Sequence, residues 1–382
     1  MNTPSQEIQG KFEEFLKKGE APYNYERILL EKHWARISCI LEGGNPPPYE
    51  LEIQTSPYCN VSCSHCIGRE CGRLKGSIGK FEIDRLEEMI DDFEDGSLFR
   101  IETIKFCGLT GEPLTNPYTA YALEKFSRKN KEVKLFTNGM GLENIDYSGR
   151  SNLESILCID HLNLSLDAGC DETLKAIKGP RADYNTIFRG VRGLAERRKG
   201  RKPEIAISFV IGKNNYGDIE RATYDAKKVG ADIVRFKINI MDRLDDGLSL
   251  KIIEHLGRAK ELEDSKFKVI SIHSEEEIKG EKPEIFGEKD SVSCYTSALW
   301  GCVGSDFQFY PCGHSCHPGA KPYGNLYVNT LNEIWNSECR KDLRKCLPGE
   351  GCFVCSPFSL RANEFLTYLS KLPNGTVHEL WS

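Results

Sequence analysis

Three cysteines stand at a spacing that suits an iron–sulfur cluster. Cys59, Cys63 and Cys66 form the pattern C-x3-C-x2-C, directly after a short apolar run. Three thiolates on one loop can hold three irons of a [4Fe–4S] cubane and leave the fourth iron without a protein ligand. An iron with a free position can bind and activate a further molecule. The alternative is a zinc loop that His65 or Cys71 completes.

A second group of cysteines lies toward the C-terminus. Eight occur between residues 294 and 355, and the 382-residue chain contains 16 in all. A reducing compartment does not keep so many cysteines as disulfides, so soft-metal sites with zinc or iron–sulfur are favoured. A zinc ribbon is one arrangement, with the ligands Cys312, Cys316, Cys352 and Cys355.

The elements that must position these cysteines alternate along the chain. Candidate strands, separated by stretches of helical periodicity, are residues 51–53, 101–106, 133–136, 161–166, 205–211, 233–240 and 267–272. Alternating strands and helices predict parallel strands with right-handed crossovers. The pattern favours an α/β barrel, closed or open, over a sandwich.

Two of the predicted strands have one polar face. Arg235, Lys237 and Asn239 alternate with apolar residues in one strand, and the run from Asn163 to Asp167 does so in another. Because a closed TIM barrel fills its interior with apolar side chains, these polar faces predict a hollow barrel that holds polar ligands. The alternative is an edge strand with one wet face. The three polar residues of the strand predicted at 233–240 suit either a hydroxylated or anionic substrate or salt bridges within the barrel.

The cysteine loop after the first strand resembles the signature of the radical S-adenosylmethionine (SAM) superfamily. The resemblance covers residues 50–272 and continues at later strand ends, in Leu109-Thr110-Gly111-Glu112-Pro113, Thr137-Asn138-Gly139, Ser165-Leu166-Asp167, Lys178-Gly179 and Val210-Ile211-Gly212. It implies a partial (β/α)6-type barrel whose [4Fe–4S] cluster, on Cys59, Cys63 and Cys66, reductively cleaves SAM to a 5′-deoxyadenosyl radical.

The resemblance also implies a set of SAM contacts. Gly111, Glu112 and Pro113 would meet the amino group, since an acceptor facing an ammonium is favourable. Asn138 would lie near the methionyl part, and Ser165 and Asp167 near the ribose. Ile211 and His65 would contact the adenine; His65 stands where the family usually has an aromatic residue.

Two positions depart from the family pattern. Thr110 replaces a glycine of the motif after the second strand. Lys178 replaces an arginine that would bind the SAM carboxylate, and lysine keeps the charge but loses the bidentate fork.

The C-terminal cysteine-rich run resembles the auxiliary-cluster domains called SPASM and Twitch. The matching motifs are residues 306–312, Gly324-Asn325-Leu326, Glu333-Ile334-Trp335 and the final C-x2-C pair. Phe307 replaces a glycine, which predicts an altered hairpin turn. The resemblance implies one auxiliary [4Fe–4S] cluster on Cys294, Cys312, Cys352 and Cys355, because the two-cluster SPASM form needs further cysteines after Cys355. The cysteines left over are Cys302, Cys316, Cys339 and Cys346. Each could be an alternative ligand, a hydrogen-atom donor or a buried small hydrophobe, and the last is the commonest.

An auxiliary cluster suggests an oxidation, because a fully ligated cluster near the substrate can take up an electron. The expected function is therefore a radical SAM oxidoreductase that acts on a small molecule or a peptide. An external donor such as flavodoxin or ferredoxin would supply electrons. The short stretch before the first strand favours a small molecule, or a peptide delivered by a partner.

Three other functions stay open. An epimerase would need a hydrogen-atom donor, for which Cys107 and Cys170 are the candidates because they lie near strand ends. A peptide cross-linking maturase would use the same cofactors. A zinc-binding scaffold protein would use the same cysteines without SAM.

Bulk composition limits the partners. The net charge of −6 provides no general field for nucleic acid. The sequence has neither an apolar run that suits a membrane span nor a signal-peptide pattern, so a cytoplasmic protein is expected. The predicted divisions are an N-terminal extension (1–49), the barrel (50–272), a linker (273–293), the auxiliary domain (294–360) and a C-terminal helix and tail (361–382).

Overall fold

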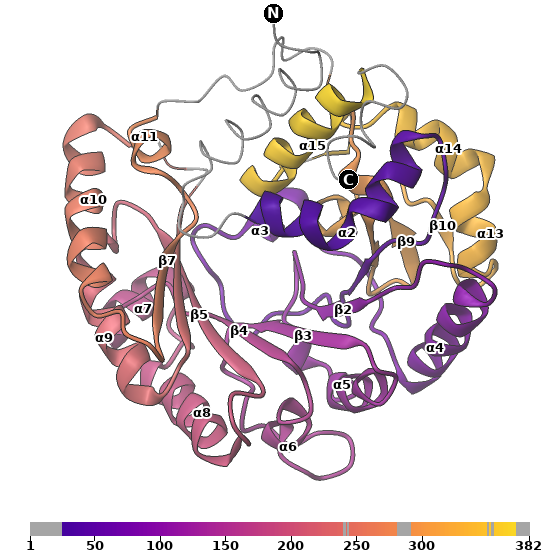
Figure 1. Cartoon of the computed structure of the whole chain (residues 1–382). Helices are drawn as coiled ribbons and strands as arrows, with labels where there is room; N and C mark the ends of the chain where they lie inside the picture. The colour runs from indigo at the N-terminus through magenta and orange to yellow at the C-terminus, as the bar shows by residue number, and fades with distance from the viewer. Residues whose placement is uncertain are drawn as a thin grey trace, which may run out of the picture.

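A curved sheet organises the chain (Figure 1). The computed structural model describes residues 25–239, 242, 244–280, 292–349, 351–352 and 355–371. The sheet order is β10-β9-β8-β1-β2-β3-β4-β5-β6-β7. The strands are β1 (Glu50–Ile53), β2 (Thr103–Phe106), β3 (Glu132–Thr137), β4 (His161–Ser165), β5 (Glu204–Ile211), β6 (Ile233–Ile238), β7 (Lys268–Ser271), β8 (Trp300–Val303), β9 (Gln308–Tyr310) and β10 (Gly324–Asn325).

The predicted α/β architecture is confirmed. Each of the seven predicted strands forms, as β1 to β7, and neighbours in this series pair in parallel. The sheet ends at β7 on one side and β10 on the other, so the barrel is partial rather than closed.

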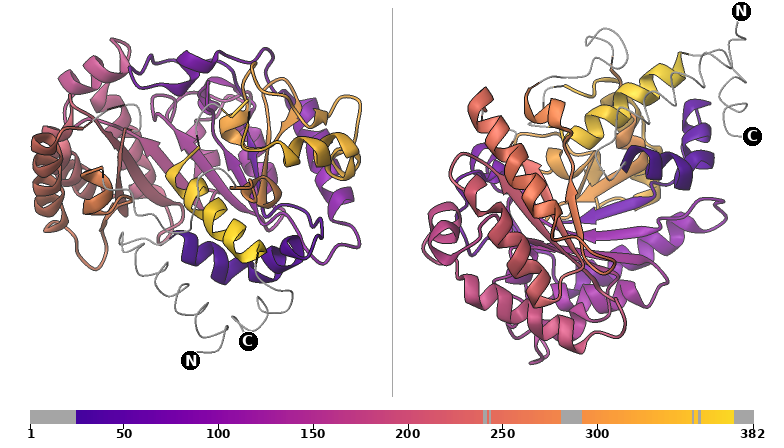
Figure 2. Two further views of the ribbon diagram at one scale, coloured as in Figure 1. Left: turned by 90° about the horizontal axis from the view of Figure 1, so that it is seen from above. Right: turned by 60° about the vertical axis from the view of Figure 1, so that its left-hand side comes forward.

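Helices cover the outer, convex face of the sheet (Figures 1 and 2). They are α4 (Lys80–Glu94), α5 (Thr119–Ser127), α6 (Asn152–Ile156), α7 (Asp171–Lys178), α8 (Tyr184–Arg197), α9 (Ile219–Val229) and α10 (Asp246–Lys260). The apolar face of α4 is buried at Leu86, Met89, Ile90 and Phe93. Asp183 and Asp245 cap α8 and α10 by accepting backbone N–H groups, which satisfies donors that a helix start leaves free.

The main apolar core lies between this outer helical layer and the sheet. Alternate strand residues such as Ile104, Leu135, Leu164, Ile207 and Val234 belong to it, each with no exposed surface. Since successive side chains on a strand point to opposite faces, the intervening residues face the concave side. That side forms the lumen of the partial barrel.

The C-terminal region extends the same sheet. β8 pairs with β1 in parallel along its whole length, from Glu50 beside Trp300 to Ile53 beside Val303. β9 and β10 follow as antiparallel neighbours. The helices here are α12 (Thr296–Leu299), α13 (Leu331–Asn336) and α14 (Glu338–Lys345). The predicted domain boundaries stay a prediction, but residues 300–303 share one sheet with the barrel.

Two helices from distant parts of the sequence pack together across the open side (Figure 1). They are α2 (Tyr25–Leu41) and α15 (Pro357–Ser370). Ile37 and Ile40 join Phe365, Leu366 and Leu369 in one apolar cluster. Short helices complete the described elements: α3 (Ile67–Cys71), α11 (Glu275–Ile278), η1 (Pro113–Thr115), η2 (Tyr216–Asp218) and η4 (Gly313–Ser315).

Phe307 occupies the turn between β8 and β9, where the resembled pattern has glycine. Its φ is +56°, a left-handed conformation that costs a non-glycine residue about 1–2 kcal/mol. The ring is fully buried and lies 4.9 Å from the ring of Tyr327 between centroids. The turn is therefore kept without glycine, and burial of the ring offsets the backbone strain.

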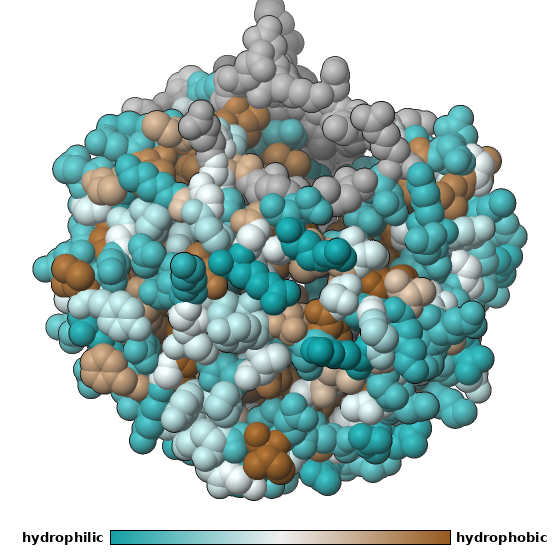
Figure 3. Space-filling view, turned by 180° about the vertical axis from the view of Figure 1, so that it is seen from behind, coloured by the Kyte–Doolittle hydropathy of each residue, from teal (hydrophilic) through white to brown (hydrophobic). Residues whose placement is uncertain are grey.

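The outer surface carries no extended apolar band in the view of Figure 3, where hydrophobic residues are scattered among hydrophilic ones. Among the helices of the described residues, none combines the length and apolar character that crossing a bilayer requires.

Candidate active site

The lumen is polar, as the alternation of β4 and β6 predicted. At the N-terminal ends of the strands it carries a belt of opposite charges. Lys105 Nζ lies 2.7 Å from Glu52 and 3.6 Å from Glu50. His161 bridges Glu132 and Glu204 at 2.8 and 3.2 Å. These two carboxylates raise the pKa of His161 to about 9, so the imidazole is protonated at neutral pH.

The loop that carries Cys59, Cys63 and Cys66 is anchored on the C-terminal end of α7. The backbone N–H of Ser62 donates to the Lys178 carbonyl, and that of Ser64 to the Ile177 carbonyl, both at 2.8 Å. Gly179 has φ +86°, and a Cβ there would overlap the Ser62 hydroxyl. The Lys178-Gly179 pair therefore holds the cysteine loop in place.

The three thiols lie close enough to influence one another. Burial raises the pKa of Cys63 to about 11, and the charges of Cys66 and Cys59 add to this. Burial likewise raises the pKa of Cys59, with Cys66 acting in the same direction. Within the described part of the chain, no three Cys, His, Asp or Glu side chains converge on a single-ion position. A cubane has a different requirement, namely one thiolate for each iron that the protein ligates, here three of the four.

The segment after β2 closes onto this loop. The Glu112 N–H donates to the Tyr58 carbonyl at 2.6 Å, and a Cβ at Gly111 would overlap the Ser56 carbonyl oxygen. The buried Glu112 carboxylate accepts from the Thr137 hydroxyl at 2.6 Å and the Asn138 N–H at 2.7 Å. Glu112 thus ties the β2 and β3 ends together, and its predicted contact to an amino group stays a prediction.

Asp167, at the end of β4, is the centre of a buried ion pair. It has φ +65° and no exposed surface. Lys178 Nζ lies 2.8 Å from its carboxylate, and His65 Nε2 lies 3.5 Å away. The Val210 N–H donates to it at 2.7 Å. Burial alone would raise the pKa of Asp167, but the charges of Lys178 and His65 hold it well below its usual range.

Lys178 differs from the position that the resemblance suggests. Its ammonium donates to the Ser165 carbonyl at 2.7 Å and the Ser165 hydroxyl at 3.0 Å, besides pairing with Asp167. An ammonium has three donors, and these contacts use all of them. Lys178 therefore has no donor left for a SAM carboxylate, and its position fits an internal counter-ion of Asp167.

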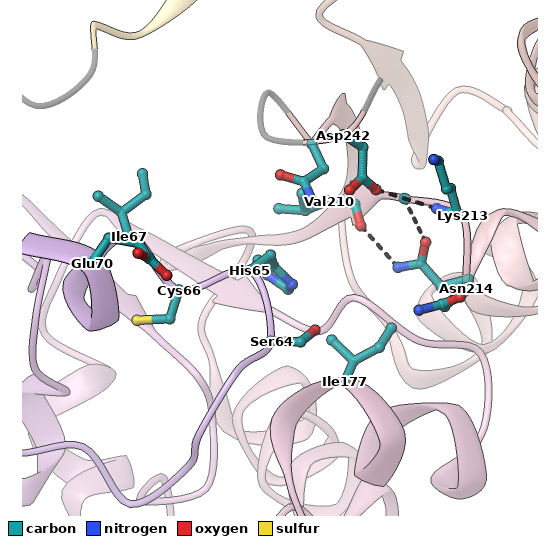
Figure 4. Close-up of a pocket in the computed structure, with 13 residues that line it drawn as sticks. Ser64, His65, Cys66, Ile67, Glu70, Ile177, Val210, Lys213, Asn214 and Asp242 are labelled. Carbon is teal, nitrogen blue, oxygen red and sulfur yellow. Dashed lines mark hydrogen bonds between the residues drawn. The ribbon is translucent and has the colours of Figure 1, made fainter. Parts of the chain in front are cut away.

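A cavity of about 250 Å³ adjoins Cys66. Figure 4 shows His65 between Cys66 on one side and Val210 with Asp242 on the other. Ile67 and Ile177 supply apolar surface, and the remaining lining residues are Ser64, Glu70, Gly212, Lys213, Asn214, Asn215 and Asn239. The side chain of Ile211 points the other way, into the outer core, so Val210 and Gly212 line the cavity in its place.

Residues 53–240 match the family described as the Radical SAM superfamily. This segment is a radical SAM domain. It includes the cysteine loop, the Glu112 segment, Asp167 and most of the cavity lining. Domains of this superfamily use a [4Fe–4S] cluster and SAM, so the match indicates an enzyme. No curated protein sequence matches the chain.

Solved structures support the same fold. SuiB of Streptococcus suis, bound to S-adenosylmethionine, is similar with a TM-score of 0.59 and 16% identity, over 85% of this chain and 74% of SuiB. SuiB bound to its precursor peptide SuiA gives 0.57 at 16% identity, over the same shares. The structure of anSMEcpe with bound AdoMet gives 0.54 at 18% identity, over 82% of this chain and 88% of anSMEcpe.

The four cysteines predicted for an auxiliary cluster lie in the C-terminal region, outside the matched segment, and their role stays a prediction. Burial raises the pKa of Cys355 to about 12, and the charges of Cys294, Cys312 and Cys352 act in the same direction. The three other cysteines, from separate segments of the chain, are therefore near enough for their charges to act on the Cys355 thiol. The site adjoins the lumen, because Gln54 donates to the carbonyl of Gly313, next to Cys312, at 3.3 Å.

The two hydrogen-donor candidates lie in different surroundings. Cys107, just after β2, is half-buried in the lumen, and burial raises its pKa well above the usual range, with the charge of Glu52 adding to this. Cys170 is exposed and precedes α7, with its sulfur 3.3 Å from the Thr173 hydroxyl. Only Cys107 belongs to the lumen of the radical SAM domain.

Some lumen residues had no place in the sequence interpretation. Glu50, Glu52 and Lys105 alternate with buried apolar residues in β1 and β2. The apolar/polar alternation that predicted polar faces for β4 and β6 would therefore have predicted these residues as well. His314 lies in a turn of the C-terminal region, and its charge neighbours include Glu52. No local pattern places a turn residue such as His314 against Glu52, which lies 262 positions earlier in the sequence.

Proposed function

We propose that this chain is a radical SAM oxidoreductase with an auxiliary [4Fe–4S] cluster. When bound, SAM and the first cluster would supply a 5′-deoxyadenosyl radical that takes a hydrogen atom from the substrate, and the second cluster would accept an electron. The proposal depends on one observation. The charges of Cys294, Cys312 and Cys352 act on the Cys355 thiol, and the Gly313 carbonyl beside Cys312 accepts from Gln54 at the polar lumen whose rim carries the cysteine loop.

The residues at the rim fit the first cluster and SAM. Cys59, Cys63 and Cys66 would hold three irons, and the cavity beside Cys66 would receive SAM. Its Ile177 and Val210 surfaces suit an adenine ring, and its Ser64 and Asn239 side chains suit polar groups. Asp167 and Lys178 would form the floor of this site, because their mutual pairing fixes the β4 end and the cysteine loop together.

The residues in the C-terminal region fit a fully ligated cluster. Cys294, Cys312, Cys352 and Cys355 would provide four thiolates. Burial raises the pKa values of Cys312, Cys352 and Cys355, so cluster binding there must displace protons, which makes assembly depend on pH. A cluster without an open position suits electron transfer rather than ligand activation.

Two substrate classes are compatible with this site. A small molecule would fit within the lumen. A peptide is favoured by the likeness to SuiB, which has been solved with its precursor peptide SuiA; in that case the chain would be a peptide-modifying or cross-linking enzyme. An epimerase is the alternative function, favoured by Cys107 in the lumen, because a thiol there would return a hydrogen atom to the substrate radical. An external donor such as flavodoxin or ferredoxin would provide the electron.

Oxygen-free reconstitution tests the proposal. The wild-type protein should bind about eight irons, as expected for two cubanes, and form 5′-deoxyadenosine from SAM only with reductant. Replacing Cys59, Cys63 and Cys66 with alanine should abolish SAM cleavage and leave about four irons. Replacing Cys312 and Cys355 should also halve the iron, but SAM cleavage should persist.

Other results would decide against it. Stoichiometric zinc without SAM cleavage would support a scaffold protein. Solvent deuterium incorporated into a product without net oxidation would support an epimerase.

A further inference from the structure

A positively charged surface adjoins the cysteine loop, although the net charge of the chain is −6. The segment after Cys66 exposes Arg69, Arg73 and Lys75 against one exposed carboxylate, Glu70. Among the described residues, no carboxylate forms an ion pair with Arg73 or Lys75. These cations are therefore available to a partner from outside the chain.

Arg69 connects this surface directly to the loop that would hold the first cluster. Its backbone N–H donates to the Cys66 carbonyl at 3.1 Å. Its guanidinium donates to the Cys63 carbonyl at 3.4 Å and is exposed to solvent. Tyr58, immediately before Cys59, is also 66% exposed. The cysteine loop can thus be approached from the outer surface of the protein.

The C-terminal region contributes a further cation to the same surface. Leu74, which separates Arg73 from Lys75, is buried in a small apolar cluster. Ala320 packs against this cluster, and the exposed Lys321 follows it in the sequence. Cations from both sides of this packing contact therefore lie near one another. Together with Arg69 they make up what we call the basic face.

The acidic residues nearest to the basic face do not neutralise it. The Asp306 carboxylate accepts from the Tyr310 hydroxyl and the Gln308 amide, each at 2.9 Å. Glu70 lines the cavity beside Cys66. An excess of positive charge therefore remains, and complementary charge both steers a partner to such a surface and sets its orientation there.

The proposed reaction also needs an entry point for electrons that SAM and the substrate leave free. The cavity beside Cys66 has a volume of about 250 Å³, which is far too small for a protein. A protein donor must therefore dock on the outer surface, close to the cysteine loop. The basic face satisfies both conditions.

We propose that the basic face docks an acidic electron-transfer protein of the flavodoxin or ferredoxin type. The donor's reduced cofactor loses one electron and the first cluster gains it, and no bond forms or breaks at the face. This inference rests on the proposed function for the presence of that cluster. Docking itself depends on charge, so it can be measured as binding.

Charge reversal tests the basic face. Reconstituted, oxygen-free protein is titrated with purified acidic flavodoxin and ferredoxin, and calorimetry gives the Kd. The triple variant Arg73→Glu/Lys75→Glu/Lys321→Glu should bind the donor at least about tenfold more weakly than wild type, and its Kd should depend less on salt. Arg69 is kept, because it contacts the cysteine loop. If charge reversal lowers the iron content, Lys75→Gln and Lys321→Gln should shift the Kd in the same direction by less.

A second triple variant controls for net charge. Exposed cations of the outer helices α8, α9 and α10 are replaced in Arg192→Glu/Lys228→Glu/Lys251→Glu. This variant changes the net charge by the same amount and should bind the donor as wild type does. Equal Kd values for the two triple variants, or no binding of either donor to wild type, overturn the proposal. Polyglutamate that binds more tightly than both donors would assign the face to acidic peptides and also overturn it.

Reduced methyl viologen, a small cation, separates docking from catalysis. With viologen as reductant, the basic-face variant should cleave SAM within about twofold of the wild-type rate, whereas flavodoxin-driven cleavage should fall about tenfold. An equal fall with both reductants contradicts a docking role. Wild type that binds the donor but cleaves no SAM with viologen removes only the radical SAM function. Wild type that cleaves SAM with viologen but binds neither donor removes only the docking face.

Discussion

The buried pair between Asp167 and Lys178 gives the sharpest quantitative prediction. Both side chains are at most 1% exposed, and their charged atoms are 2.8 Å apart. Lys178→Met leaves a buried carboxylate whose remaining donors are Ser165, the Val210 N–H and His65. Breaking a buried pair from one side costs about 3–5 kcal/mol. Because His65 offers partial compensation, we expect the lower limit, about 3 kcal/mol, or roughly a hundredfold in the unfolding equilibrium.

Urea unfolding followed by tryptophan fluorescence measures this loss. Asp167→Asn should be similarly destabilised, since it leaves a buried ammonium. The double variant carries neither charge. Its loss of unfolding free energy should therefore be smaller than the sum of the two single losses by about 2 kcal/mol or more. Lys175→Met, one turn earlier on α7, removes the exposed partner of Asp171 and should leave the urea midpoint nearly unchanged. Additive losses in the double variant, within about 0.5 kcal/mol, would refute the claim that the two groups stabilise each other.

Three further variants probe other parts of the molecule. Gly111→Ala should lower the iron retained by the cysteine loop, because its methyl group meets the Ser56 carbonyl, whereas Gly257→Ala, with open space around it, should retain full iron. Phe307→Gly should cost about 2 kcal/mol in urea unfolding, since lost burial of about 3–5 kcal/mol exceeds the relieved strain of about 1–2 kcal/mol; a stabilised variant would contradict this. His161 has a pKa of about 9 in the folded protein, above its ordinary 6.5, so its stabilisation is full below pH 6.5 and lost as the pH rises through 9. His161→Gln should therefore be less stable than wild type at pH 6 and equal to it at pH 10; a gap independent of pH would exclude the ion pairs as its cause.

The sheet was predictable because each strand carries its own signal. Apolar runs of strand length alternate with amphipathic helices, and β1 to β7 formed where those runs occur. The pairing of β8 with β1 had no such signal, because register between strands 250 positions apart depends on the folded chain. The same holds for the packing of α2 on α15.

The site was predictable at the level of motifs but less so at the level of side-chain direction. Ile211 was expected to face a ligand, yet its parity with Phe209 and Ile207 places it in the outer core. Lys178 was expected to bind the SAM carboxylate, yet its ammonium is used by Asp167 and Ser165 of the chain itself. Motif position fixes which loop a residue belongs to. The partner of a charged group depends on which opposite charge is buried beside it, and that information lies in tertiary contacts.

The parallel pairing of β8 with β1 has a mechanical consequence. A C-terminal region joined through a linker alone could swing away from the barrel, but hydrogen bonds along a shared strand edge make hinge motion there expensive. The span between Cys312 and the loop of Cys59 is then set by the sheet itself. Cutting the chain before β8 would bare the edge of β1, a surface that recruits other strands, so the barrel and its C-terminal wall constitute one inseparable chamber.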